Sequence, residues 1–323
     1  MPFITTQRIH LLIAVTTVAV SAFTLTSLFG RRPYLELATH FRLQYALAAT
    51  ACLILLACFH SWKLLPVALV CAALNWAFIL PYYAGSRSAT APGAIHLRLM
   101  HANILGGNRD YAALIAIVEE ERPDVVVLQE FTEAWEEHLR HPLGSQYPYS
   151  KAAPRPGGSG MALYSRYPLE GAEVLNLDAS SHLALSARVN VEGTSLSVLA
   201  LHPPTPMRRD KFKHRNEQFA RAASIMKETR GPRVLIGDLN TTMWSPYFTD
   251  LVRESGLGNA RQGFGLIPSW PAPLPALLQI PIDHCLVGGM TLEAIRTGGR
   301  TGSDHRPLLV EVSFERSAER ASR

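Results

Sequence analysis

Three long apolar stretches near the N-terminus constrain this chain more than any other feature. They cover roughly residues 11–30, 43–60 and 64–83, and none has Asp, Glu, Lys or Arg in its interior. Each is close to the ~20 residues that a helix needs to cross a bilayer core. The first could instead be a signal peptide with a weak cleavage site at Val20-Ser21-Ala22. The other two would still hold the protein in the membrane, so we predict three transmembrane helices within residues 1–85.

Charge is distributed unevenly between the two parts of the chain. Residues 1–90 contain six cations and a single anion, Glu36, of the 31 cations and 26 anions in the whole chain. Residues 91–323 therefore hold 25 of each and have the composition of an ordinary soluble domain. The basic isoelectric point is thus no evidence for nucleic-acid binding. This composition excludes fibrous and disordered classes. A disulfide scaffold is excluded as well, since Cys285 is the single cysteine of this part.

The loop charges bear on membrane topology. With three spans, the N-terminus and the second loop share one side, which carries Arg8 and Lys63. The opposite side carries Arg31, Arg32, Arg42 and Arg87. The positive-inside rule therefore weakly favours a cytoplasmic soluble domain.

The remainder of the chain alternates short strand patterns with a few helix patterns. A small, polar segment at residues 86–94 is typical of a linker, and a domain covering residues 95–323 follows. Asn108 is a plausible N-cap for a helix ending at Glu121, and Ser245-Pro246 for one ending near Ser255. Strands are expected at 95–102, 123–130, 161–164, 183–191, 195–201, 233–238, 282–287 and 307–314, with a long charged helix at 209–230. Many strands with three or four helices predict an α/β fold in which a two-sheet β-sandwich is flanked by helices.

Polar residues follow several of the apolar strands, where a rigid sheet holds side chains in fixed geometry. Taken singly, such residues are more often turn or cap residues. Their order along the chain, however, resembles the endonuclease/exonuclease/phosphatase family, which has the DNase I-like fold, and its membrane-attached bacterial branch in particular. The motifs are Asn103, Leu-Gln-Glu130, Tyr-Ser-Arg166-Tyr-Pro, Leu-His202-Pro, Gly-Asp238-Leu-Asn240, Ile-Asp283-His and Ser-Asp304-His305.

The resemblance implies a metal site. Phosphoester hydrolysis needs a divalent cation to neutralise phosphate charge and donors that face the developing oxygens. Glu130 is the best ligand, and Asn103 and Asp304 complete a set of hard oxygens that suits Mg²⁺, with Mn²⁺ as an alternative.

The resemblance also implies the catalytic residues. Asp238 would orient or deprotonate water, and Asn240, two residues later, would position that water or hold a phosphate oxygen. His305 would donate to the phosphate, with Asp283 fixing its tautomer, and His202 would make a second phosphate contact.

Two weaker signals stay open. The segment Arg208–Arg215 packs five cations into eight residues; it is either the solvated start of a helix or a patch for an anionic substrate or headgroup. Trp244 and Trp270 either line a substrate cleft or belong to the core.

Three functions compete at this stage. The first is a membrane-anchored, metal-dependent phosphoesterase acting on a phosphate ester or pyrophosphate of a membrane-associated substrate. The second is a tethered endonuclease or exonuclease that binds nucleic acid, and the third is a catalytically inactive scaffold. We expect the bilayer and a phosphorylated, possibly lipid-linked substrate as partners, and we infer no obligate protein partner. The expected location is the bacterial inner (cytoplasmic) membrane with an extracytoplasmic domain, although the charge count leaves the side open.

Overall fold

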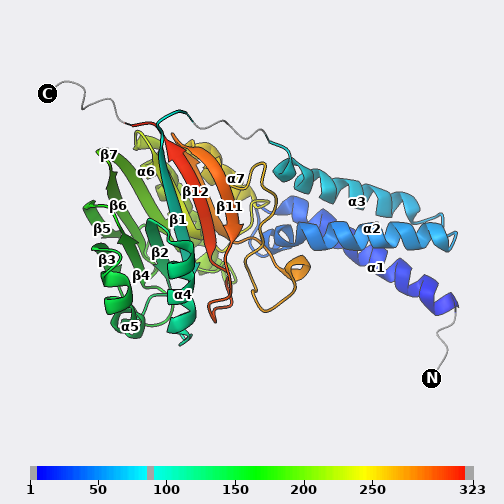
Figure 1. Ribbon diagram of the computed structural model, residues 1–323. Helices are drawn as coiled ribbons and strands as arrows, with labels where there is room; N and C mark the ends of the chain where they lie inside the picture. The colour runs from blue at the N-terminus through cyan, green and yellow to red at the C-terminus, as the bar shows by residue number, and fades with distance from the viewer. Residues whose placement is uncertain (1–5, 86–90, 317–323) are drawn as a thin grey trace.

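The computed structural model describes residues 6–85 and 91–316 and shows a helical bundle attached to a two-sheet domain (Figure 1). Three helices, from residues 6–29, 35–58 and 65–83, are long and apolar enough to cross a membrane, which agrees with the three apolar helices predicted. The second begins earlier than its apolar pattern, because a 3-10 helix leads directly into it. The bundle consists of α1 (Thr6–Thr26), η1 (Ser27–Phe29), η2 (Leu35–Phe41), α2 (Arg42–Cys58), α3 (Leu65–Ile79) and η3 (Leu80–Tyr83).

The domain is built from two six-stranded sheets, as predicted. The first has the order β11-β12-β1-β2-β4-β3, and the second has the order β5-β6-β7-β8-β10-β9. The strands of the first sheet are β11 (Thr291–Thr297), β12 (Leu308–Phe314), β1 (Ile95–Asn103), β2 (Val125–Gln129), β4 (Met161–Ser165) and β3 (Tyr149–Ala153). Those of the second are β5 (Leu169–Leu175), β6 (Ala184–Val191), β7 (Thr194–Leu201), β8 (Arg233–Asp238), β10 (Asp283–Gly288) and β9 (Gly258–Asn259).

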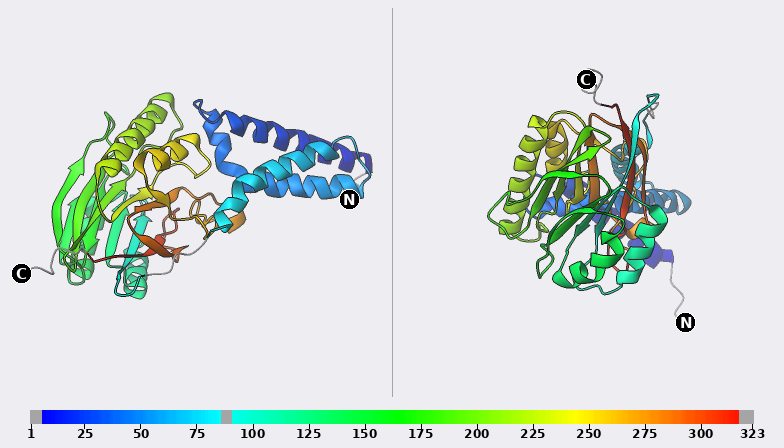
Figure 2. Two further views of the ribbon diagram at one scale, coloured as in Figure 1. Left: turned by 90° about the horizontal axis from the view of Figure 1, so that it is seen from above. Right: turned by 60° about the vertical axis from the view of Figure 1, so that its left-hand side comes forward.

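Alternation along the strands explains how the sheets pack. Leu97 and Leu99 of β1 share one face with the inner residues of β6 and β7, and together they form the core between the sheets. Helices α4 (Tyr111–Glu121) and α5 (Glu133–Gly144) cover the outer face of the first sheet. Helices α6 (Arg209–Glu228) and α7 (Pro246–Ser255) cover the second, so each sheet has a helical layer outside it (Figure 2).

Several sequence-based details needed correction. The N-cap of α4 is Asp110 rather than Asn108, because the Asp110 side chain accepts a hydrogen bond from the Ala113 amide. Asn108 instead donates to the carbonyl groups of Ile104 and Thr301. The patterns missed α5, β3, β5 and β11, whose residues are more polar and less regularly alternating. Ser245 caps α7 as predicted. The predicted linker lies largely outside the described residues, so the domain boundary stays a prediction.

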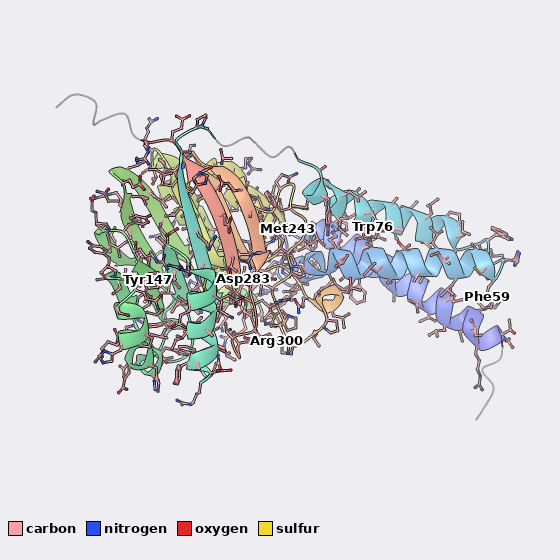
Figure 3. The ribbon with its side chains drawn as sticks, in the orientation of Figure 1. Phe59, Trp76, Tyr147, Met243, Asp283 and Arg300 are labelled. Atoms are coloured by element: carbon pink, nitrogen blue, oxygen red, sulfur yellow. The ribbon has the colours of Figure 1, made fainter. Side chains whose placement is uncertain are left out.

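The bundle contacts the domain through the C-terminal end of α3 and the η3 that follows it. Trp244 Nε1 donates to the Phe78 carbonyl at 3.0 Å, and the Tyr82 carbonyl accepts from the Gly263 and Gly265 amides. Trp76 packs against the same apolar cluster as Met243, and Figure 3 shows both residues at this junction. Trp244 therefore belongs to the junction rather than to a substrate cleft.

Candidate active site

The ends of four neighbouring strands bring the predicted site residues together. Asn103 ends β1, and Glu130 follows β2, which runs parallel to β1. Asp238 ends β8 directly opposite Asp283, the first residue of the antiparallel β10. Figure 3 shows Asp283 near the centre of the domain, on the side towards the bundle. Because both sheets end here, residues far apart in sequence meet at one site.

Close polar contacts join Asp238 and Asp283 to two histidines, His305 and His202. His305 Nδ1 hydrogen-bonds Asp283 Oδ2 at 2.9 Å, and its Nε2 lies 3.5 Å from Asp238 Oδ2. His202 Nε2 lies 3.7 Å from the same Asp238 oxygen. All four side chains are almost completely buried. Asp283 is thus hydrogen-bonded to His305, the contact that the predicted pairing requires, and the other ring nitrogen lies close to Asp238.

Burial and mutual charge divide these groups into different protonation states. Burial lowers the pKa of His305, but the carboxylates of Asp283 and Asp238 outweigh it and raise this pKa to about 10. Burial raises the pKa of Asp238 to about 7, against the opposing charge of His305. Burial lowers the pKa of His202 to about 3. At neutral pH, His305 is therefore a cationic donor, and His202 is a neutral imidazole.

Unusual backbone geometry holds two site residues in place. Glu130 and Asn240 adopt left-handed conformations, with φ of 60° and 50°. Such conformations in residues other than glycine cost energy and are common at functional sites. Gly237 allows β8 to approach β7, because a Cβ there would lie 2.0 Å from the Leu201 carbonyl oxygen.

The oxygen-bearing residues proposed as metal ligands also meet. Asn103 Nδ2 lies 3.0 Å from Glu130 Oε1 and 3.2 Å from Asp238 Oδ2. Asp304 accepts a hydrogen bond from Trp270 Nε1 at 3.0 Å and lines the same pocket as Glu130. The ligand atoms of Asp238, Asp283 and His305 also lie within 4.8 Å of one another, close enough to share a metal ion.

The charge of this pocket fits a divalent cation. The pocket has a volume of about 450 Å³, and Glu130, Asp238 and Asp304 line it. Its described lining residues include neither lysine nor arginine. A phosphate would therefore meet three carboxylates and one cationic side chain, His305. Glu130, Asn103 and Asp304 offer the hard oxygens that Mg²⁺ prefers and are the residues that would hold such an ion.

The remaining predicted residues border the same pocket. Asn240 accepts from Thr205 Oγ1 at 3.1 Å and donates to the Pro203 carbonyl, so its amide is fixed beside the turn that follows β7. His202, at the start of that turn, also lines the pocket. Trp270 lines it as well and is thus the cleft residue of the two tryptophans. All eight predicted site residues gather here, while their individual roles stay predictions.

Sequence reasoning missed two buried residues that support the site. His101 lies on β1 with its Nδ1 3.5 Å from Asp283 Oδ1. Gln129 accepts from the Asp238 amide at 2.9 Å and donates to the Leu201 carbonyl. His101 lies two residues before Asn103 and therefore on the same strand face, a signal that could have found it.

The other side of the pocket was also unexpected. Leu37, His40 and Phe41 of η2 line it, although in sequence they lie between α1 and α2. Ile280, Ile282 and Met207 extend this apolar side. The pocket is thus shared by the strand ends and the helical N-terminal part of the chain.

Comparison with solved structures places the domain in a known fold. The humanized D. rerio TDP2 structure aligns with a TM-score of 0.58 at 17% identity, covering 67% of this chain and 98% of that one. An endonuclease/exonuclease/phosphatase protein from Beutenbergia cavernae aligns with a TM-score of 0.55 at 21% identity, covering 68% and 72%. Sphingomyelinase C from Streptomyces griseocarneus aligns with a TM-score of 0.51 at 19% identity, covering 68% and 100%. At these identities the likeness establishes the fold. No curated protein matched the sequence.

The sequence itself matches a family model over residues 100–305, well over half of the chain. This range contains every predicted site residue. Enzymes of the matched family generally depend on divalent metals, which agrees with the charge of the pocket. The chain belongs to the Endonuclease/Exonuclease/phosphatase family and is an enzyme that hydrolyses phosphoester bonds.

Proposed function

We propose that this protein is a membrane-anchored, Mg²⁺-dependent phosphoesterase that hydrolyses a phosphate ester or pyrophosphate of a membrane-associated substrate. The three apolar helices support the anchoring. The proposed location is the bacterial inner membrane, with the catalytic domain outside the cytoplasm.

One observation carries the choice of substrate. The pocket that holds Asp238 and His305 is completed by Leu37 and Phe41, which belong to the membrane-attached part of the chain. A soluble phosphoester would not require an apolar surface so close to the bilayer. A substrate held in the membrane would meet both surfaces at once.

The arrangement of residues supports a hydrolytic mechanism. Asp238 is placed to orient a water molecule and accept its proton, since its pKa of about 7 matches neutral operation. His305, protonated and held by Asp283, would donate a hydrogen bond to a phosphate oxygen, and Asn240 would fix a second one. A divalent ion held by Glu130, Asn103 and Asp304 would neutralise phosphate charge.

Nucleic acid is the alternative substrate, and one feature favours it. Arg208, Arg209, Lys211 and Lys213 at the start of α6 are exposed, and Lys211 lines a depression that also contains Glu130 and His202. A cationic surface of this kind suits a phosphate backbone. The exposure of these four cations fits both interpretations of the segment, whereas Arg215 is buried and belongs to neither.

The test uses the full chain in detergent with Mg²⁺, with EDTA, and with EDTA followed by Mn²⁺. Plasmid DNA, a chromogenic phosphodiester and a polyprenyl pyrophosphate are offered side by side. We expect turnover of the lipid that EDTA abolishes and that Asp238→Ala reduces roughly 10²–10⁴-fold. Glu254→Ala, an exposed acidic residue of α7, is the matched control and should retain activity.

Cleavage of plasmid DNA without lipid turnover would establish the nuclease reading instead. Turnover that persists in EDTA would contradict the metal requirement.

A further inference from the structure

One half of the catalytic pocket is lined by apolar side chains that take no part in the proposed hydrolytic chemistry. Leu37 and Phe41 form one side of it, and Met207, Trp270, Ile280 and Ile282 continue it. Phe41 and Met207 remain 39% and 60% exposed, so this surface is open rather than filled by neighbouring side chains. Ligand pockets of this size are typically apolar with a few converging polar groups. The polar groups of this pocket lie at its strand-end side.

The segment that supplies Leu37 and Phe41 is fixed firmly onto the catalytic domain. We call residues 27–41 the inter-span segment. Its Glu36, 1% exposed, accepts hydrogen bonds from Arg215 of α6, from Thr241 and from Ser245. A buried carboxylate is tolerated when it is paired and fully hydrogen-bonded. The inter-span segment therefore has a defined position over the pocket.

A second contact fixes the segment closer to the catalytic residues. His40 Nδ1 lies 3.1 Å from Thr242 Oγ1, and Thr242 follows the Asp238–Asn240 motif by two residues. The same turn of chain thus carries catalytic groups and holds the apolar wall. The distance between the two halves of the pocket is consequently set by one short segment.

An apolar surface links this half of the pocket to the region of the spans. Leu277 and Leu278 of η4 (Ala276–Leu278) are 60% and 55% exposed, and nearby Leu274 is 43% exposed. Gln44, near the start of α2, donates to the Leu277 and Gln279 carbonyl groups, which places η4 beside the second span (Figure 1). Exposed leucines at this position would contact lipid rather than water.

We propose that Leu37, Phe41, Met207, Trp270, Ile280 and Ile282 form a subsite for the hydrocarbon chain of a lipid phosphoester, and that the inter-span segment is its specificity-determining wall. This inference rests on the proposed function and deepens it. The hydrocarbon chain of the substrate would pass along the η4 leucines to the subsite, and its phosphate would lie between His305 and Glu130. The occupant is thus an amphiphile with an anionic head and an aliphatic tail.

The test measures inhibition by n-alkyl phosphates, from ethyl to octyl, against a chromogenic phosphodiester, using the full chain in detergent with Mg²⁺. The readout is the ratio of the inhibition constants for ethyl and octyl phosphate. Each methylene buried in the subsite should lower the inhibition constant roughly fourfold until the subsite is full. Partition into detergent is the same for every variant, so differences in this ratio between proteins report on the subsite.

Phe41→Ala and Met207→Ser should each reduce the ratio at least tenfold, whereas Tyr149→Ala should leave it unchanged. Tyr149 lies on β3 and is 40% exposed, which matches Phe41. Met207 is exposed on the catalytic domain, so its substitution tests the subsite even if changes in the inter-span segment prevent folding. The subsite would be refuted if the ratio of the ethyl and octyl inhibition constants were near one in the unmodified protein, or if neither variant changed it. The proposed hydrolase activity would not be affected by either result. Absence of turnover on every phosphoester would instead refute the proposed function.

Discussion

Two buried ion pairs in this molecule differ in what surrounds them. Asp283 and His305 have side chains that are 0% and 6% exposed, and Glu36 and Arg215 have side chains that are 1% and 0% exposed. Burial therefore does not distinguish them. His305 lines the pocket, and its Nε2 lies 3.5 Å from Asp238 Oδ2. Neither Glu36 nor Arg215 is among the described residues that line this pocket, and both oxygens of Glu36 accept hydrogen bonds.

The surroundings of Arg215 complete the contrast. Its guanidinium lies 5.3–5.4 Å from the ring centroids of Phe212, Phe219 and Tyr247, and Nε donates to Asn216. These contacts enclose the pair in an aromatic and polar shell. An ion pair whose imidazole lines a pocket can act on a substrate there. A pair whose carboxylate is fully bonded can only hold two parts of the chain together.

The largest effect should come from breaking the open pair. Asp283→Asn removes the larger of the negative charges that raise the pKa of His305, so the cationic form of the imidazole is less favoured. We expect kcat to fall roughly 10²–10⁴-fold, measured on the chromogenic phosphodiester. Glu311→Gln, which alters a carboxylate paired with Arg98 on the surface, is the matched control. A kcat close to that of the unmodified enzyme would show that this pair is structural too.

Breaking the enclosed pair should affect stability first. Glu36→Gln leaves Arg215 buried without a counter-charge, which typically costs about 3–5 kcal/mol. We expect a markedly lower melting temperature in detergent, with Glu217→Gln, a partly exposed position on α6, as the control.

A double variant sharpens this test. Glu36→Leu combined with Arg215→Met removes both charges and should recover much of the lost stability, since the penalty comes from an unpaired buried charge. A double variant as unstable as Glu36→Gln would attribute the loss to the Ser245 and Thr241 hydrogen bonds instead.

The smallest change in stability is expected from breaking an exposed ion pair, Arg31–Asp250. Arg31 of the inter-span segment binds Asp250 of α7 at 2.7 Å, but the Arg31 side chain is 63% exposed. A hydrogen bond from Arg31 lowers the pKa of Asp250 below its unfolded value. The pair therefore stabilises the fold above about pH 4, and this contribution is lost as the pH falls through the folded-state pKa.

Arg31→Ala should lower the melting temperature slightly at pH 7 and low salt. The difference should disappear in 1 M salt, where exposed charges are screened, and at a pH low enough to protonate Asp250. A difference that persists at high salt would mean that Arg31 acts through packing.

Most of the residues on the strand-end side of the pocket could be predicted from the sequence. Glu130, Asp238 and Asp283 lie at the ends of apolar strands, and strand ends meet at one edge of a sandwich. The sequence analysis did not predict His101 and Gln129, because both belong to strands, where a buried polar residue looks like an irregularity of the hydrophobic pattern. Trp270 lies in a long loop between β9 and β10, and no local pattern predicts that this loop passes beside the pocket.

Local patterns in the sequence were enough to predict three apolar helices, a two-sheet domain and the residues that gather at the pocket, because hydrophobic periodicity and strand ends are local properties. That the inter-span segment lines this pocket follows from the fold alone. Glu36 was the single anion of an apolar region, and Arg215 was one cation in a charged helix, 179 residues away. Whether a charge is solvated or buried depends on what packs against it, and that packing joins parts of the chain whose local patterns are independent.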